Sequence, residues 1–176
     1  MRLQLAYFLL LSVTTVQADG QAIVEAIQKI SASSAKLNNT VVNFQAGLLG
    51  LGDSIHLLID SSNLLKEIKS GTEVAEESAP LDFLETLSVA GATQALVTDV
   101  QIVLTSTVNA KPKFDKLLIV SPTVLVNLKM QRKASAAFSE AVIGKVPVEL
   151  QETARNLVGP IDVAFEAAIA EYNPFG

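Results

Sequence analysis

The residues whose type and spacing most suggest chemistry in this sequence are small and hydroxyl-bearing ones that interrupt its apolar stripes. They are Ser34, Ser62, Gly91, Thr98, Thr105 and Ser135. Leucine or isoleucine is expected at such positions in a tightly packed helix bundle. Small side chains on facing helices leave space, and hydroxyls facing that space can bond water or the head group of a ligand. Alternatively, the hydroxyls bond to carbonyls one turn earlier and let the helices approach each other.

Basic side chains are concentrated between residues 111 and 133. The six in this segment are Lys111, Lys113, Lys116, Lys129, Arg132 and Lys133. Such a basic rim could receive a carboxylate or phosphate head group; alternatively, it is a solvated face of a bundle. Because the formal net charge is −5, we expect no nucleic-acid binding, which needs an excess of clustered Lys and Arg.

The residue types needed for catalysis and metal binding are nearly absent. The one histidine, His56, has no Gly-x-Ser-x-Gly elbow to accompany it, and we interpret it as an exposed or core-edge residue. The glycines between residues 47 and 52 lack the strand context and the lysine of a phosphate-binding loop, so we interpret them as a hinge. The chain has no cysteine, which excludes disulfides and Cys-ligated metals. We therefore predict a protein that is not an enzyme and has no cofactor.

Residues 1–18 are typical of a secretory signal peptide, with a basic start, an apolar run over residues 5–13 and small residues before Asp19. The run is too short for a bilayer span of about 20 residues. The composition, 49% apolar, is that of a globular chain. We expect a secreted single domain over residues 19–176 without a transmembrane segment. Asn38 opens the only Asn-x-Ser/Thr triplet and is a candidate for N-glycosylation.

The spacing of apolar residues predicts an all-α fold, an antiparallel bundle of about five long helices. The clearest stripe begins with Ile23, Ile27 and Ile30, at alternating steps of four and three residues. We predict helices over residues 21–46, 55–70, 80–109, 111–142 and 150–172. The fourth is expected to be kinked or split near Pro122, because proline lacks an amide donor. The acidic residues between 73 and 77 are expected in a loop.

The same spacing predicts which face of each later helix points inward. These faces comprise Ile55, Leu58, Ser62 and Leu65 in the second helix; Leu84, Leu87, Gly91, Ala95, Thr98, Ile102 and Thr105 in the third; Leu125, Leu128, Arg132, Ser135, Phe138 and Val142 in the fourth; and Leu150, Ala154, Leu157, Ile161, Phe165, Ala168 and Tyr172 in the last.

Several segments of the mature chain resemble those of one family. They are residues 19–23 and 37–41, Phe114-Asp115-Lys116, residues 124–129 and 136–139, Lys145-Val146-Pro147 and residues 161–172. In these segments the sequence is similar to the fungal hydrophobic surface binding protein A family, which includes cell-wall galactomannoproteins. The resemblance implies a secreted fungal helical bundle that adsorbs to hydrophobic surfaces and encloses fatty acids or related lipids. The chain shows no Ser/Thr-rich stalk or anchor, so covalent attachment to the cell wall is not expected.

The leading hypothesis is a non-catalytic lipid-binding protein that sequesters a fatty acid or similar ligand among its helices. The expected lining is Leu37, Phe44, Leu58, Phe83, Leu87, Leu118, Leu128, Phe138 and Phe165. Ser34, Thr98 or Ser135 is expected to hold the head group, and filling Gly91 or Ser135 with leucine is expected to weaken binding. The alternative hypothesis is a surface-active adhesion protein that adsorbs to hydrophobic surfaces and recruits secreted hydrolases.

Overall fold

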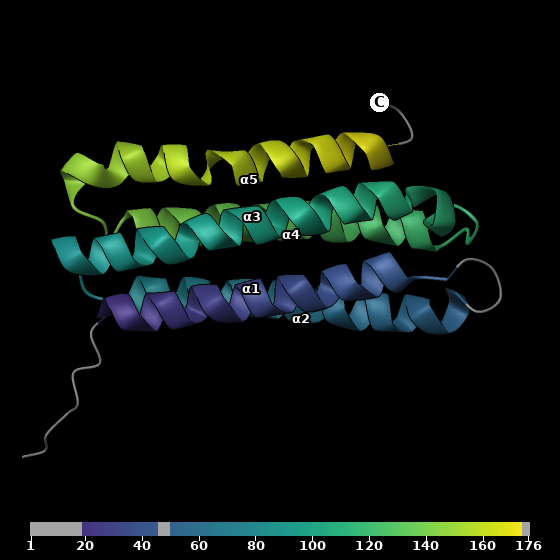
Figure 1. The fold of residues 1–176 in the computed structure, drawn as a ribbon, viewed down its shortest axis with the longest axis horizontal. Coiled ribbons are helices and arrows are strands. Elements are labelled where there is room, and N and C mark those ends of the chain that lie inside the picture. Colours follow the sequence, from purple (N-terminus) through teal and green to yellow (C-terminus); the bar gives the residue numbers. More distant parts are fainter. Residues whose placement is uncertain (1–18, 46–49, 174–176) are drawn as a thin grey trace, which may run out of the picture.

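The computed structural model describes residues 19–45 and 50–173, which form a bundle of five long helices (Figure 1). The helices are α1 (Asp19–Asn43), α2 (Gly50–Glu77), α3 (Phe83–Phe114), α4 (Val120–Ile143) and α5 (Gln151–Tyr172), with a short 3-10 turn, η2 (Val148–Leu150), before α5. The predicted all-α fold is confirmed, and the described residues contain no strand. The predicted signal peptide and Gly47 of the predicted glycine hinge lie outside the described residues. Gly50 and Gly52 do not form a hinge, because α2 begins at Gly50 and not at residue 55 as predicted.

The helices form a closed ring in which each packs extensively on two others. α1 packs on α2 and α3, α4 packs on α2 and α5, and α3 packs on α5. Figure 1 shows α1 and α3 in front, α2 and α4 behind them, and α5 along the upper edge. Consecutive helices are antiparallel, as predicted, whereas the ring neighbours α1, α3 and α5 run in the same direction. α3 and α4 face each other across the interior with few direct contacts.

The predicted inward stripe of α1 is confirmed. Ile23, Ile27 and Ile30 are almost completely buried. The stripe continues past the end of the helix to Phe44, whose ring packs edge-to-face on Phe114 with 4.7 Å between ring centroids. Because α1 has a single apolar face, its spacing is sufficient to determine which side points inward.

The second half of the predicted inward face of α5 is also confirmed. Beyond Pro160, which lies inside the helix, Ile161, Phe165 and Tyr172 are buried. The Tyr172 hydroxyl donates a hydrogen bond of 2.6 Å to the carbonyl of Thr107 on α3. Burial raises the pKa of Tyr172 well above its usual range. The phenol is therefore a neutral donor at every physiological pH and holds the end of α5 on α3.

The predicted inward face of α3 is wrong. Leu84, expected inside, is 71% exposed, and Leu87 and Ile102 are about half exposed. The buried face consists instead of Thr86, Val89, Thr93, Leu96, Val97, Val100, Val103, Leu104, Thr107, Ala110 and Phe114. Both faces of α3 repeat apolar residues every three or four positions, so spacing does not distinguish them. Contact with α1 and α5 selects the face with the shorter, branched side chains, which let the helices approach closely.

Two apolar faces also give α3 the length and hydropathy of a membrane span. Among the described helices, α3 is the only one that is long and apolar enough to cross a bilayer. A third of its most apolar segment is buried within the bundle. A core helix of a globular protein meets the same criterion. Here α3 packs along both α1 and α5, and its buried face forms part of the common core.

The inward face of α2 is rotated from the predicted one. Leu57 and Leu64 are buried, whereas Ile55 and Ser62 are exposed. Each buried leucine is followed directly by a second leucine, so the sequence is compatible with two rotations of the helix.

The acidic residues between 73 and 77 are not in a loop, because α2 continues to Glu77. Gly71, which suggested a helix end, lies where α2 approaches other helices. A Cβ atom there would lie 3.1 Å from the Phe138 ring and 3.2 Å from Ile30. This glycine therefore serves close packing rather than a turn.

The prolines around the α3–α4 connection have roles that differ from the predicted ones. α3 continues through Pro112 to Phe114, whose buried ring anchors the helix end. The predicted split near Pro122 is confirmed, but it falls before the proline, because Pro122 lies in the first turn of α4. Amide groups in the first turn of a helix have no carbonyl acceptor within that helix, so proline removes no hydrogen bond at this position. In α4, the residue that points inward is Gln131 and not the predicted Arg132.

A buried carboxylate links α1 to α2. Asp60 is 6% exposed, accepts a hydrogen bond of 2.7 Å from the Thr40 hydroxyl and lies 2.9 Å from the Lys36 ammonium. Burial alone would raise the pKa of Asp60, but the Thr40 hydrogen bond and the Lys36 charge outweigh it, and the pKa is lowered. The carboxylate therefore stabilises the fold at neutral pH.

We expect Asp60→Asn to lower the free energy of unfolding by about 2 kcal/mol at pH 7, the value of hydrogen bonds to a charged group. Because the folded-state pKa of Asp60 is lowered, its contribution is complete above the unfolded value of about 3.9 and is lost as pH falls through the folded value. The difference between variant and wild type, measured by urea unfolding, should thus shrink as the pH falls below about 4. The control is Glu73→Gln, an exposed change in the same helix. A difference that is independent of pH would contradict the assignment.

Candidate functional site

The first of two apolar cavities lies in the half of the ring nearest the α4–α5 connection. It has a volume of about 170 Å³ and receives side chains from all five helices. Its wall includes Val89 and Val100 of α3, Phe138 of α4 and Phe165 of α5. This volume slightly exceeds that of an engineered cavity of about 150 Å³ that holds benzene.

The second cavity lies toward the opposite end of the ring, near the α3–α4 connection. Its volume is about 230 Å³, and α1 to α4 line it. Leu37, Leu57, Phe114 and Leu128 contribute much of its apolar wall. At its outer end the wall is made by Ile119, which is 70% exposed.

Three residues in the middle of the ring border both cavities. They are Val103 and Leu104 of α3 and Gln131 of α4. Gln131 is only 4% exposed. Its amide nitrogen donates to the hydroxyl of Ser61 on α2 at 2.9 Å and lies 3.3 Å from the Ser61 carbonyl. A polar contact between α2 and α4 thus lies where the two cavities meet.

Ser34 supplies the one fully buried hydroxyl of the first cavity that lacks a partner. It is 0% exposed, and its Oγ forms no hydrogen bond. Two buried threonines of α3 bond instead to their own helix: Thr93 donates to the Val89 carbonyl and Thr107 to that of Val103. Ser34 therefore fits the interpretation that a hydroxyl faces internal space, whereas Thr93 and Thr107 fit the interpretation that the hydroxyl bonds to a carbonyl one turn earlier. Ser34 is the position at which an entering polar group would gain a hydrogen bond.

The structure brings eight of the twelve predicted site residues to the cavities. Ser34, Leu87, Ser135, Phe138 and Phe165 border the first, and Leu37, Leu58 and Leu128 border the second. Whether these residues contact a ligand stays a prediction. Their position supports the hypothesis that the bundle interior is the site.

The remaining four predicted site residues border neither cavity. Phe44 is buried at the helix end against Phe114. Phe83 is 60% exposed and Leu118 is 92% exposed. Thr98 faces solvent on α3 and bonds to the Gln94 carbonyl. Phe83 and Thr98 were misplaced because the inward face of α3 was misassigned.

The interrupting positions on α2 and α3 do not face internal space. Ser62, Gly91 and Thr105 are exposed, and a Cβ at Gly91 would meet nothing within 4 Å. Leucine at Gly91 would therefore not fill a cavity, contrary to the sequence-based expectation. Ser135, by contrast, borders the first cavity.

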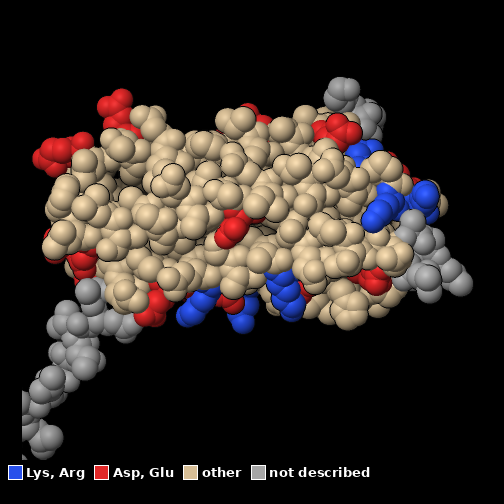
Figure 2. Space-filling model, viewed as in Figure 1, with Lys and Arg blue, Asp and Glu red and all other residues tan. Residues whose placement is uncertain are grey.

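The basic segment does not form one rim. Lys111 pairs with Asp115 at 2.8 Å, and Lys113 donates to the carbonyls of Val42 and Phe44 at the end of α1. The space-filling view shows charged side chains mainly at the edges and ends of the visible face (Figure 2). These two lysines thus bond near helix ends, and their positions do not support the alternative in which the segment forms a single receptor for a head group.

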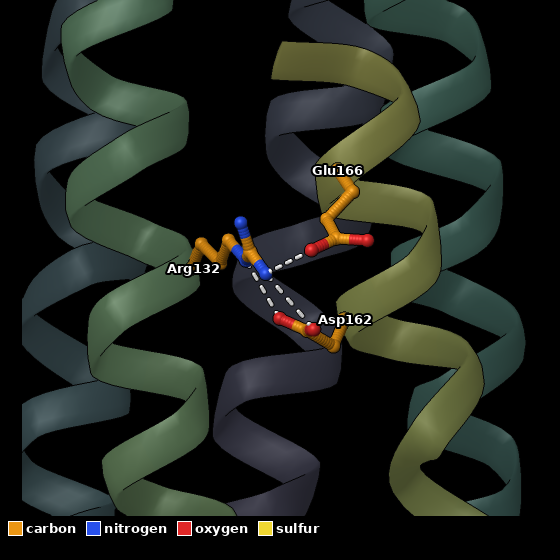
Figure 3. A network of polar contacts seen from close by, with 3 residues as sticks. All are labelled: Arg132, Asp162 and Glu166. Atoms are coloured by element: carbon orange, nitrogen blue, oxygen red, sulfur yellow. Dashed lines mark hydrogen bonds and ion pairs between the residues drawn. The ribbon is translucent and has the colours of Figure 1, made fainter. Parts of the chain in front are cut away.

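Arg132 spans the seam between α4 and α5 (Figure 3). Its guanidinium contacts Asp162 at 2.6 and 3.0 Å and Glu166 at 2.5 Å. The Arg132 hydrogen bond lowers the pKa of Asp162. Beside this network lies a hollow of about 160 Å³, which borders the first cavity. The two share Ser135, Ser139, Val158, Ile161 and Phe165.

The described residues contain no group of three His, Asp or Glu side chains positioned to hold a metal ion. His56 is exposed on α2. Asn38, the candidate glycosylation residue, is half-buried in α1, and its Oδ1 is enclosed without a partner. Glycosylation of Asn38 stays a prediction.

Gln131 was not among the predicted site residues, although the sequence contains a signal for it. Val124, Leu128, Gln131, Ser135 and Phe138 follow one another at steps of four and three residues. A glutamine inside an apolar stripe indicates a buried polar contact. The predicted stripe passes instead through the neighbouring Arg132.

Comparison with known proteins gives one family and several solved relatives. The family model for hydrophobic surface binding protein A matches residues 20–144. Cell wall mannoprotein 1 of Talaromyces marneffei is 29% identical over 143 residues, which is 81% of this chain. The match spans only 30% of that relative's length.

Two solved structures are similar over nearly their entire length. Ligand binding domain 2 of the Penicillium marneffei MP1 protein, complexed with multiple arachidonic acids, is 27% identical with a TM-score of 0.82, covering 90% of this chain and 99% of that domain. AFMP4P in complex with palmitic acid is 23% identical with a TM-score of 0.82, covering 88% of this chain and 99% of that one. The second likeness, at this low identity, shows the fold alone.

Replacement of the unpaired hydroxyl should make the lipid-free protein more stable. We expect Ser34→Ala to raise the free energy of unfolding of delipidated protein by about 1 kcal/mol, because it removes a buried donor without a partner. Urea unfolding followed by circular dichroism measures this, with Ser33→Ala, the same change at the neighbouring, partly exposed position of the helix, as the control. A destabilised Ser34→Ala protein would show that the hydroxyl has a partner within the fold.

Proposed function

The chain belongs to the hydrophobic surface binding protein A family, and we propose that it is a secreted, non-catalytic protein that holds a fatty acid or similar single-chain lipid inside its ring of helices. The observation that carries this proposal is the pair of apolar cavities with a buried, unpaired hydroxyl at Ser34. An aliphatic chain with one polar end matches that arrangement.

The cavities favour an acyl chain for energetic reasons. Each methylene group transferred from water to an apolar interior gains about 0.8 kcal/mol. The walls at Val89, Val100 and Phe138 offer such an environment without competing polar groups. The Ser34 hydroxyl can donate one hydrogen bond and accept others. It therefore suits a carboxylate or an ester oxygen.

The relatives support the same assignment. The MP1 domain, 27% identical to this chain, was solved with arachidonic acids. Secretion is supported by the predicted signal peptide at residues 1–18 and by the likeness to a cell wall mannoprotein. Association with the cell wall belongs to the same proposal.

Native mass spectrometry of the secreted protein, followed by organic extraction and lipid analysis, tests the proposal. We expect an adduct of fatty-acid mass at one or two per chain. Protein stripped of lipid should regain that mass when incubated with palmitic acid. A polypeptide mass that stays bare after this incubation would refute an internal lipid site.

The first cavity can be filled from its wall. We expect Ser135→Leu to weaken palmitic acid binding on the order of tenfold, because the added side chain occupies the space of about two methylene groups. Isothermal titration calorimetry measures the affinity. Gly91→Leu, which adds the same side chain at an open surface position, should bind as wild type does. Equal affinities for the two variants would place the ligand elsewhere.

A second function, adsorption to hydrophobic surfaces, is favoured by a different observation. The stripe that was expected inside α3 faces outward and presents Leu84, Leu87 and Ile102 to solvent. In Figure 2 the face of the molecule that includes α1 and α3 carries few charged side chains. Exposed large apolar side chains on a face with few charges favour interaction with a surface or partner. Recruitment of secreted hydrolases to such a surface is part of this second proposal.

Adsorption and internal binding are separable by mutation. We expect the double variant Leu84→Ser with Ile102→Ser to lower the amount adsorbed on polystyrene beads severalfold, because burial of about 25 cal/mol per Å² of apolar area is lost. Its palmitic acid affinity should not change, because neither residue borders a cavity. The matched control replaces Val126 and Val163, exposed valines of α4 and α5, with serine. Equal adsorption by the two double variants would exclude the α3 face as the adsorbing surface.

A further inference from the structure

Gln131 stands where a long ligand would have to pass. Both cavities end at this side chain, and Val103 and Leu104 face it from α3. The bond from Gln131 to Ser61 joins the neighbouring helices α4 and α2 and holds the glutamine side chain at this place in the wall. Gln131, Val103 and Leu104 therefore lie where the two cavities, called compartments below, meet.

Each compartment is small compared with a long acyl chain. The volumes are about 170 and 230 Å³, and a cavity of about 150 Å³ holds a single benzene ring. A short chain fits within one compartment while Gln131 stays bonded to Ser61. A chain of sixteen carbons or so must enter both compartments, which requires the Gln131 side chain to move and its bond to Ser61 to break.

We propose that Gln131 is the residue that determines ligand chain length, because its bond to Ser61 closes the passage between the two cavities. This inference rests on the proposed lipid-binding function and assigns a selectivity to that site. A long chain gains apolar contacts in the second compartment but loses the Gln131–Ser61 hydrogen bond. A short chain loses nothing. The Gln131–Ser61 bond is thus a partition between the compartments. It makes the ratio of long-chain to short-chain affinity smaller than the difference in buried apolar area alone would predict.

The competing explanation is that Gln131 only fastens α2 to α4. Both explanations predict that truncation destabilises the fold, because the Ser61 hydroxyl and carbonyl lose a donor. They differ in their effect on ligands. If Gln131 only holds α2 and α4 together, its loss changes the affinities for all chain lengths by the same factor. If Gln131 separates the compartments, its loss changes the ratio of long-chain to short-chain affinity.

The test compares octanoic acid with palmitic acid by isothermal titration calorimetry on delipidated full-length secreted protein. In Gln131→Ala we expect the ratio of palmitic to octanoic affinity to rise about fivefold or more, the equivalent of one net hydrogen bond. Gln101→Ala, the same change at an exposed position of α3, should leave the ratio at its wild-type value. Native mass spectrometry adds the stoichiometry: two octanoic acids per wild-type chain are expected, one in each compartment.

Gln131→Met provides a second variant if the alanine variant does not fold. Methionine keeps a similar length but cannot donate to Ser61, so the ratio should again rise. An unchanged ratio in a folded variant, with both acids still bound, would overturn the partition and leave the lipid-binding proposal intact. Absence of binding of both acids to wild-type protein would instead overturn the lipid-binding proposal.

Discussion

The structure depends on one geometric constraint, which is that five helices closed into a ring enclose more volume than their inward side chains fill. α3 and α4 lie on opposite sides of that ring and barely touch. The inward face of α3 is built largely of valine and threonine, whose short side chains do not reach the opposite wall. The cavities, the buried Ser34 hydroxyl and the isolated contact between Gln131 and Ser61 all follow from this incomplete filling.

The sequence was sufficient to predict the fold class and the helices with a single apolar face. For α1, only one rotation buries Ile23, Ile27 and Ile30, and this rotation is the one observed. For α3, two rotations satisfy the same rule, and the choice between them is made by contacts with α1 and α5 that spacing does not encode. Most of the predicted site residues that failed to reach a cavity come from that ambiguity or from the connection near Leu118.

Pro112 and Gly71 were misleading for a related reason, since their meaning depends on neighbours distant in sequence. Gly71 resembles a helix end, but the ring of Phe138 explains it. Pro112 resembles a boundary between two helices, but α3 continues through it to the buried ring of Phe114. Gln131 had a recognisable signal in its spacing, whereas its partner Ser61 belongs to a helix whose rotation the sequence left open.

The cavities are lined by the same residues that form the hydrophobic core, because the ring has no central helix and no separate binding domain among the described residues. Selection for stability and selection for ligand capacity therefore act on the same positions. A substitution that improves packing by filling the interior removes room for the ligand, so a more stable variant is expected to be a poorer carrier. Evolution of this fold toward a new ligand consequently requires changes in core residues. The number of such changes is limited by the free energy of unfolding, to which no disulfide contributes in this protein.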